Sequence, residues 1–169
     1  MSRPARLSSI SYNGPGGYFV TTCTHERRRI FDRAAVVDLT LMHFLQSAGR
    51  TDVEVTAYCF MPDHLHLLVT VGTATGDLDH FMRRAKQTSG YAFAQSDGGK
   101  LWQTGYHDRV LRSDEEALNF IAYMVENPIR AGLIHKAGDW PHWGAARYTR
   151  EELLEAIALR PAWRPDWRG

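Results

Sequence analysis

Residues 53–71 read VEVTAYCFMPDHLHLLVTV and contain two strand-like runs separated by a proline. The first run, Val53 to Phe60, and the second, His64 to Val71, are both rich in β-branched and apolar residues, which is typical of strands. Pro62 lies between them in Met61-Pro62-Asp63, where it fits a turn, because a proline cannot donate a hydrogen bond inside a sheet. The stretch therefore predicts two strands joined by a short turn.

The flanking sequence predicts further strands and helices around this pair. They are a strand at 17–24, a helix at 34–49, a helix at 78–95 weakened by Ser89-Gly90, a strand at 106–111, and a helix from about 113. The last helix should stop at Asn127, because a residue before a proline is pushed out of the helical region. The order β-α-β-β-α-β, followed by an additional helix, predicts a ferredoxin-like α+β fold with an antiparallel sheet.

Length and composition favour one globular domain. The chain has 169 residues, of which 44% are hydrophobic and 23% charged, and these values exclude a disordered or fibrous protein. No stretch approaches the roughly 18 apolar residues of a membrane span and no signal peptide opens the chain, so we expect no membrane partner. Cys23 and Cys59 have no second pair with which to form a metal knuckle, which favours a reducing, cytoplasmic location.

The net charge of +1 conceals an uneven distribution. Residues 1–33 carry six Arg against two acids (+4), residues 34–146 nine bases against thirteen acids (−4), and residues 147–169 five bases against four acids (+1). A basic end beside an acidic middle suggests an edge that faces phosphates. The alternative is a solvated arginine-rich loop at residues 25–29.

His64-Leu65-His66 is the sharpest chemical feature of the sequence. On a strand, residues i and i+2 share a face, so both imidazoles point one way while Leu65, Leu67 and Val69 point into a core. Two imidazoles on one face can converge on a divalent ion, although two ligands alone hold a metal weakly. The alternative is a pair of surface histidines on the wet face of a sheet.

The last helix carries a second polar pair. Tyr123 and Asn127 are four residues apart and share one face of that helix. A phenol beside a two-histidine metal site favours attack on a phosphodiester to give a covalent phosphotyrosine. The alternatives are a tyrosine that covers the core and an Asn-Pro that ends the helix.

Together these runs resemble a known family. MPDHLHLLV at 61–69 is similar to the HUH motif of single-tyrosine transposases, in which two histidines flank a bulky hydrophobic residue. LWQ at 101–103, YHDRVLR at 106–112 and YMVENPIRAGL at 123–133 resemble the REP-associated branch of that family. The similarity spans roughly residues 15–148. It implies a single-tyrosine HUH transposase domain at 1–148, followed by a Trp- and Arg-rich extension at 149–169.

The resemblance implies a site and a reaction. His64 and His66 match metal ligands, Asn127 matches the position of a third ligand, and Tyr123 matches the nucleophile. The metal implied is Mg²⁺ or Mn²⁺. The substrate implied is single-stranded DNA beside REP-type hairpins, cleaved to a 5′-phosphotyrosine and a free 3′-OH that can later be rejoined.

Other residues compete for the same roles. Tyr91 and Gln95 repeat the tyrosine spacing on a helix, but the residues around Tyr123 match the REP-associated branch better. His107 is either a third histidine near the site or a structural residue at a strand end. Glu116 either holds a metal-bound water or caps its helix.

DNA binding should rest on phosphate contacts and on stacking. Trp102, Tyr106 and the tail tryptophans are candidates for stacking on unpaired bases, although such aromatics more often belong to a core. The predicted phosphate contacts are Arg27, Arg28, Arg29, Arg83, Arg84, Lys86, Arg109, Arg112 and Arg130.

The leading hypothesis is a metal-dependent DNA strand transferase and nickase. It would be cytoplasmic and associated with the bacterial nucleoid, with a homodimer as one option for its assembly. The alternatives are a non-catalytic hairpin-binding protein that retains the fold and a metal-dependent phosphodiesterase that uses water.

Overall fold

The computed structural model describes residues 16–112 and 114–163, of which residues 114 and 115 are described by their backbone alone. In chain order the main elements are β1 (Gly16–Cys23), α1 (Ala34–Ala48), β2 (Val53–Met61), β3 (His64–Val71), α2 (Leu78–Ser96), β4 (His107–Leu111), α3 (Asp114–Arg130), β5 (Trp143–Ala145) and α4 (Arg150–Leu159). Two 3₁₀ turns, η1 (His25–Arg27) and η2 (Ile30–Asp32), lie between β1 and α1.

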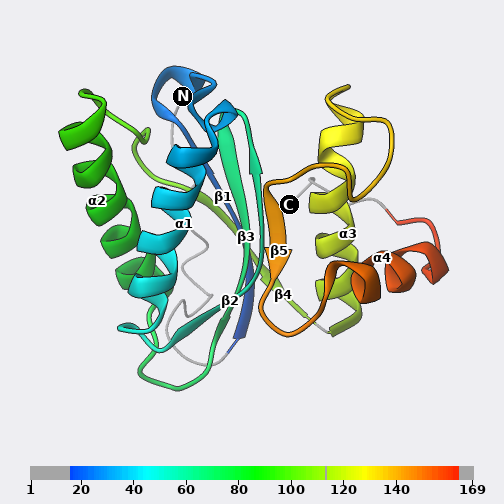
Figure 1. Cartoon of the computed structure of the whole chain (residues 1–169). Helices are drawn as coiled ribbons and strands as arrows, with labels where there is room; N and C mark the ends of the chain where they lie inside the picture. Colours follow the sequence, from blue (N-terminus) through cyan, green and yellow to red (C-terminus); the bar gives the residue numbers. More distant parts are fainter. Residues whose placement is uncertain (1–15, 113, 164–169) are drawn as a thin grey trace.

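The described strands form one five-stranded sheet with the order β4-β1-β3-β2-β5. Neighbouring strands pair antiparallel throughout. Helices α1 and α2 cover one face of this sheet, and α3 and α4 lie on the other (Figure 1). The predicted ferredoxin-like α+β arrangement is confirmed, with β5 and α4 added after it.

Strand β3 separates two hydrophobic cores. Leu65, Leu67, Val69 and Val71 belong to the core under α1 and α2, as the two-residue alternation predicts. On the opposite face, Leu68 packs with Phe19, Phe120 and other residues of the core under α3. His66 lies on that second face and is buried. The histidine pair is therefore aimed at the helix that carries Tyr123.

The prediction that the last helix stops at Asn127 is wrong. Helix α3 runs through Pro128 to Arg130. The fixed φ of proline is compatible with a helix, and its cost is the hydrogen bond that its missing N–H would have made. The stop comes instead at Gly132, with φ 71°, where the N–H of Gly132 donates to Ile129 O and that of Leu133 to Pro128 O. The helix therefore continues past Asn127.

Ser89-Gly90 does not interrupt α2, although the sequence predicts a weakness there. The Ser89 hydroxyl donates to Ala85 O over 2.6 Å and accepts from Trp102 Nε1 over 3.0 Å. A Cβ on Gly90 would meet the Trp102 ring at 3.6 Å. These small residues seat the Trp102 indole, whose burial leaves little surface for stacking on a base.

Part of the chain beyond residue 140, whose placement the sequence does not indicate, packs on the α3 side of the molecule. Strand β5 pairs with β2, and α4 begins at a capping box in which Thr149 and Glu152 exchange side-chain and backbone hydrogen bonds. Leu153 of α4 is buried in the same core as Phe120. Within the described ranges, no helix has the length and apolar character needed to cross a membrane.

Candidate functional site

His64 and His66 meet at their outer ring nitrogens. Their Nε2 atoms are 3.1 Å apart, and the two rings stand nearly perpendicular, with centroids 4.6 Å apart. The predicted same-face geometry of the strand brings them to the end of β3 next to β1, where Cys23 pairs with His64 and Thr21 pairs with His66. Two imidazoles thus converge on one point.

Each imidazole is oriented by a polar neighbour at its inner nitrogen. His64 Nδ1 donates to the Asp63 carboxylate over 2.7 Å, which leaves Nε2 without a proton in the neutral ring. His66 Nδ1 is 2.8 Å from Thr21 Oγ1, and its Nε2 is 2.7 Å from Asn127 Nδ2. Because the amide donates to Nε2, the His66 proton belongs on Nδ1. With the amide in this orientation, both outer nitrogens lack a proton and are available to a cation.

Burial favours the neutral form of both rings. It lowers the pKa of His64, and the hydrogen bond with Asp63 opposes that shift. Burial also lowers the pKa of His66 well below its ordinary value, and the charges of His64, Arg130 and Arg27 lower it further. Neutral imidazole is the form that binds metals.

Helix α3 brings Tyr123 and Asn127 to the histidines. The Tyr123 ring lies 5.9 Å from the His66 ring and edge-on to Phe19 at 6.1 Å. Asn127, one turn later, reaches His66 itself. Rotation of its amide by 180° would present Oδ1, an oxygen of the kind that Mg²⁺ and Mn²⁺ prefer. The structure therefore gathers all four residues that the sequence assigns to the catalytic and metal roles.

Arg130 lies against the same group of residues. Its guanidinium carbon is 4.3 Å from the centre of the Tyr123 ring, within the range of a cation–π contact. The same side chain donates to Tyr123 O and, over 3.4 Å, to Asn127 Oδ1. A positive charge is thus held beside the phenol.

Arg27 approaches the site from the other side. Its Nε is 2.9 Å from the Asp63 carboxylate, and its Nη1 is 2.6 Å from Cys23 Sγ, while half of its side chain stays exposed. Arg27 adopts φ 55°, a left-handed conformation that turns the chain at the end of β1. Two of the predicted phosphate contacts bond to residues that in turn bond to the histidines: Arg27 to Asp63, and Arg130 to Asn127.

The other predicted basic residues lie farther out. Arg28 donates to Lys100 O and Arg29 pairs with Asp32. On α2, Lys86 donates to the backbone oxygens of Gln103 and Gly105 and, with Arg83, lines a cavity of about 450 Å³. Arg84 is half-buried on the same helix.

Two more of these arginines lie near the start of α3. Arg109 contacts the Phe120 ring, and Arg112 donates its backbone N–H to Glu116. Glu116 also accepts from the Arg109 guanidinium.

Two competing residues are placed differently. Tyr91 is 70% exposed on α2, on the opposite face of the sheet from His66. His107 is exposed on β4 and pairs with Thr21, which in turn pairs with His66. His107 therefore shares the face of the histidine pair, with β1 between them.

Sequence reasoning missed the residues that orient the site. Asp63 adjoins His64, and that adjacency is a readable signal for a carboxylate behind a histidine. Thr21 has no such signal, because it is 45 residues from His66 and only the strand register joins them. Within the described residues, no group of three or more His, Cys, Asp and Glu side chains could hold a metal ion.

The family of the chain follows from comparison with known proteins. A family model described as "Transposase IS200 like" matches residues 17–127, well over half of the chain. The matched segment runs from β1 to Asn127 and contains the four residues gathered above. The chain belongs to this transposase family.

Named relatives point to one branch of it. A candidate REP-associated tyrosine transposase from Haemophilus influenzae is 22% identical over 91% of this chain and 88% of that protein. A REP-associated tyrosine transposase from Escherichia coli K12 is 23% identical over 52% of each chain. The resemblance inferred from the sequence motifs is thereby confirmed.

A solved structure shares the fold. It is a REP-associated tyrosine transposase bound to a REP hairpin, and it superposes with a TM-score of 0.72 at 20% identity. The superposition covers 98% of this chain and 93% of that one, so it includes part of the segment after residue 148.

Proposed function

We propose that the protein is a metal-dependent transposase and endonuclease that cleaves and rejoins single-stranded DNA beside REP-type hairpins through a 5′-phosphotyrosine. One observation carries the proposal: α3 places Tyr123 and Asn127 against His66, whose outer nitrogen also faces that of His64. The hairpin substrate is suggested by the relative that was solved with one.

In the proposed reaction, Tyr123 Oη attacks the phosphorus of a phosphodiester. An Oη–P bond forms, the bond from phosphorus to the 3′-oxygen breaks, and that oxygen leaves with the electron pair and takes up a proton. The phenol proton passes to solvent. Rejoining is the reverse, with a 3′-OH attacking the phosphotyrosine, and the covalent bond conserves the energy that hydrolysis would lose.

The chain's own residues prepare this attack. Asp63 holds His64 in the tautomer that leaves its outer nitrogen free of a proton, and Thr21 fixes the orientation of the His66 ring. Arg130 supplies positive charge beside the phenol, where negative charge develops on the phosphate. Phe19 stacks on His66 and contacts Tyr123 edge-on, which shields that side of the site from water.

The residues fit a divalent cation that is only partly enclosed. His64, His66 and Asn127 would hold it, and two imidazoles with one amide leave positions for water and phosphate oxygens. Mg²⁺ or Mn²⁺, when bound, would polarise the phosphate and align the leaving oxygen.

An adduct assay tests the proposal. Labelled single-stranded hairpin DNA is incubated with the protein and Mn²⁺ or Mg²⁺, and products are separated under denaturing conditions. A covalent protein–DNA band that disappears with a chelator is expected. Binding without an adduct would instead indicate a non-catalytic hairpin-binding protein, and free 5′-phosphate would indicate a hydrolase that uses water.

A further inference from the structure

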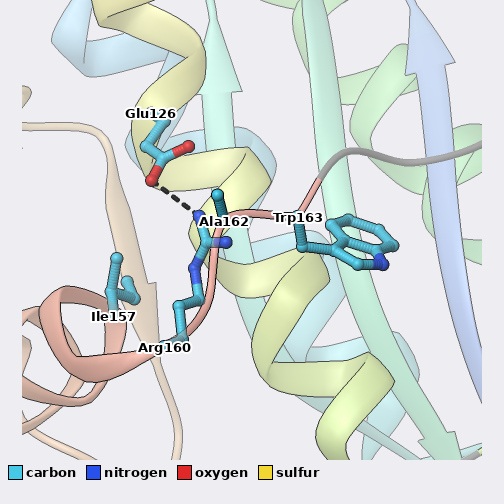
Figure 2. Close-up of a pocket in the computed structure, with 5 residues that line it drawn as sticks. All are labelled: Glu126, Ile157, Arg160, Ala162 and Trp163. Atoms are coloured by element: carbon cyan, nitrogen blue, oxygen red, sulfur yellow. Dashed lines mark hydrogen bonds and ion pairs between the residues drawn. The ribbon is translucent and has the colours of Figure 1, made fainter.

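Two arginines share one carboxylate behind the nucleophile. Glu126 Oε2 accepts from Arg130 over 3.3 Å, and Glu126 Oε1 accepts from Arg160 over 2.7 Å. Glu126 and Arg130 belong to α3, whereas Arg160 follows α4. Figure 2 shows the Arg160 guanidinium directed at Glu126 across the gap between these segments. The ion pairs thus connect the C-terminal segment to the active-site helix.

Burial of Arg160 beside Glu126 costs free energy of folding. Its side chain is only 10% exposed, and its Nε is buried without a hydrogen-bond partner among the described residues. An unsatisfied buried donor destabilises a fold, and a surface ion pair would avoid that loss. The fold therefore bears a penalty to keep this guanidinium on Glu126.

The contacts that begin at Arg160 and Glu126 continue through Arg130 to Tyr123. Arg130 Nη1 is bonded to Glu126, which leaves Nη2 for Tyr123 O and Asn127 Oδ1. With Glu126 fixed by Arg160, the Arg130 guanidinium is fixed over the Tyr123 ring at 4.3 Å. Without Arg160, Glu126 would be bonded to Arg130 alone. The Glu126–Arg130 pair could then move together toward solvent, away from the Tyr123 ring.

A second set of contacts runs from the same segment. Trp163 packs edge-on against Phe120 at 5.1 Å, Phe120 stacks on Phe19 at 4.5 Å, and Phe19 stacks on His66 at 5.2 Å. Trp163 and Arg160 also line one cavity of about 560 Å³ together with Glu126 (Figure 2). Residues 160–163 therefore support both the Tyr123 side and the histidine side of the site.

We propose that Arg160 is a positioning residue for strand transfer, which acts through Glu126 to hold Arg130 over Tyr123. This inference rests on the function proposed above. It assigns to the C-terminal segment a role in the rate of phosphotyrosine formation rather than in binding of the hairpin.

The test compares three variants of the full chain. Arg160→Met removes the charge, Arg160→Lys retains it, and Arg147→Met removes the exposed ion pair of Arg147 with Glu54 of β2. Each is assayed for hairpin affinity and, at saturating DNA, for the rate of adduct formation. We expect R160M to lower the rate roughly 10- to 100-fold with unchanged affinity, as for residues that orient a ligand shell. R160K should recover part of the rate, and R147M should match the wild type.

A double-mutant cycle with Arg130→Met isolates the pathway. If Arg160 acts through Arg130, adding R160M to R130M changes the rate little, because the effects of coupled residues are not additive. Independent losses in the double variant would overturn the proposal. So would a wild-type or faster rate in R160M, or a loss of hairpin affinity without a loss of rate.

Two further measurements keep the test decisive. If R160M unfolds, Glu126→Gln takes its place, because it keeps the shape and removes the charge that orders both arginines. In protein labelled on arginine side chains, the Nε–H signal of Arg130, assigned with R130M, should shift or broaden in the variant. Absence of any adduct in the wild type refutes the proposed function, whereas a wild-type rate in R160M refutes only this inference.

Discussion

The two faces of β3 carry different kinds of residue: one carries only apolar side chains, and the other carries the two histidines. On the α1 and α2 side, Leu65, Leu67 and Val69 are fully buried among other apolar residues. On the α3 side, His64 and His66 hold polar partners taken from three separate segments. Both faces bury apolar residues, but only the α3 face also buries polar side chains of β3. Substitutions should therefore separate stability from activity by face.

Loss of the proposed nucleophile should give the largest effect. Tyr123→Phe removes the attacking oxygen and leaves the ring on Phe19 and His66, so we expect no covalent adduct and near-normal hairpin binding. Tyr91→Phe on the opposite side of the sheet is the matched control and should form adduct normally. Adduct that survives in Y123F would remove Tyr123 from the nucleophile's role.

Two neighbouring residues of β3 test the contrast between faces directly. Leu67→Ala should cost about 2–5 kcal/mol of unfolding free energy, because it opens a cavity in the dry core. His66→Gln should lower the metal-dependent adduct rate by more than about 100-fold while costing less stability than L67A. Denaturant melts and adduct rates on both proteins provide the comparison. If the two variants lost activity and stability in the same proportion, the faces would not be functionally distinct.

A smaller effect is expected at the residue behind His66. Thr21→Val retains the shape of the side chain but removes the oxygen bonded to His66 Nδ1. The ring then loses the partner that fixes its orientation, and the affinity for Mn²⁺ should fall roughly 10-fold. Titration of Mn²⁺ by calorimetry measures this, with Thr70→Val, on the exposed end of the same sheet, as the control. Unchanged Mn²⁺ affinity in T21V would show that Thr21 does not orient the ligand.

The smallest effect concerns single phosphate contacts. Hairpin affinity should fall steeply with salt, and Arg27→Gln should reduce the slope of log K against log [salt] by about 1 at most. The Arg27 side chain is half-exposed, so solvent and a phosphate can reach it. Fluorescence anisotropy over a range of salt concentrations measures the slope. A flat response in the wild type would contradict DNA binding by phosphate contacts.

The sequence predicts what local patterns encode. Alternation along residues 64–71 places the histidines opposite the leucines, and the i,i+4 spacing places Tyr123 and Asn127 on one face of α3. The end of α3 is misjudged, because Pro128 carries a stop signal that Gly132 and its two capping hydrogen bonds override. The supporting residues escape prediction because Thr21, Glu126 and Arg160 act through contacts between distant segments.

The register of β1 on β3 also constrains when the site can form. The turn at Pro62–Asp63 joins β2 to β3 locally, so the histidine-bearing strand can pair early in folding. Thr21, however, must close a loop of 45 residues, and Asn127 one of 61, before either reaches His66. An incompletely folded chain therefore carries both histidines without the phenol opposite them. Cleavage by the proposed mechanism therefore requires that the sheet and α3 have assembled first.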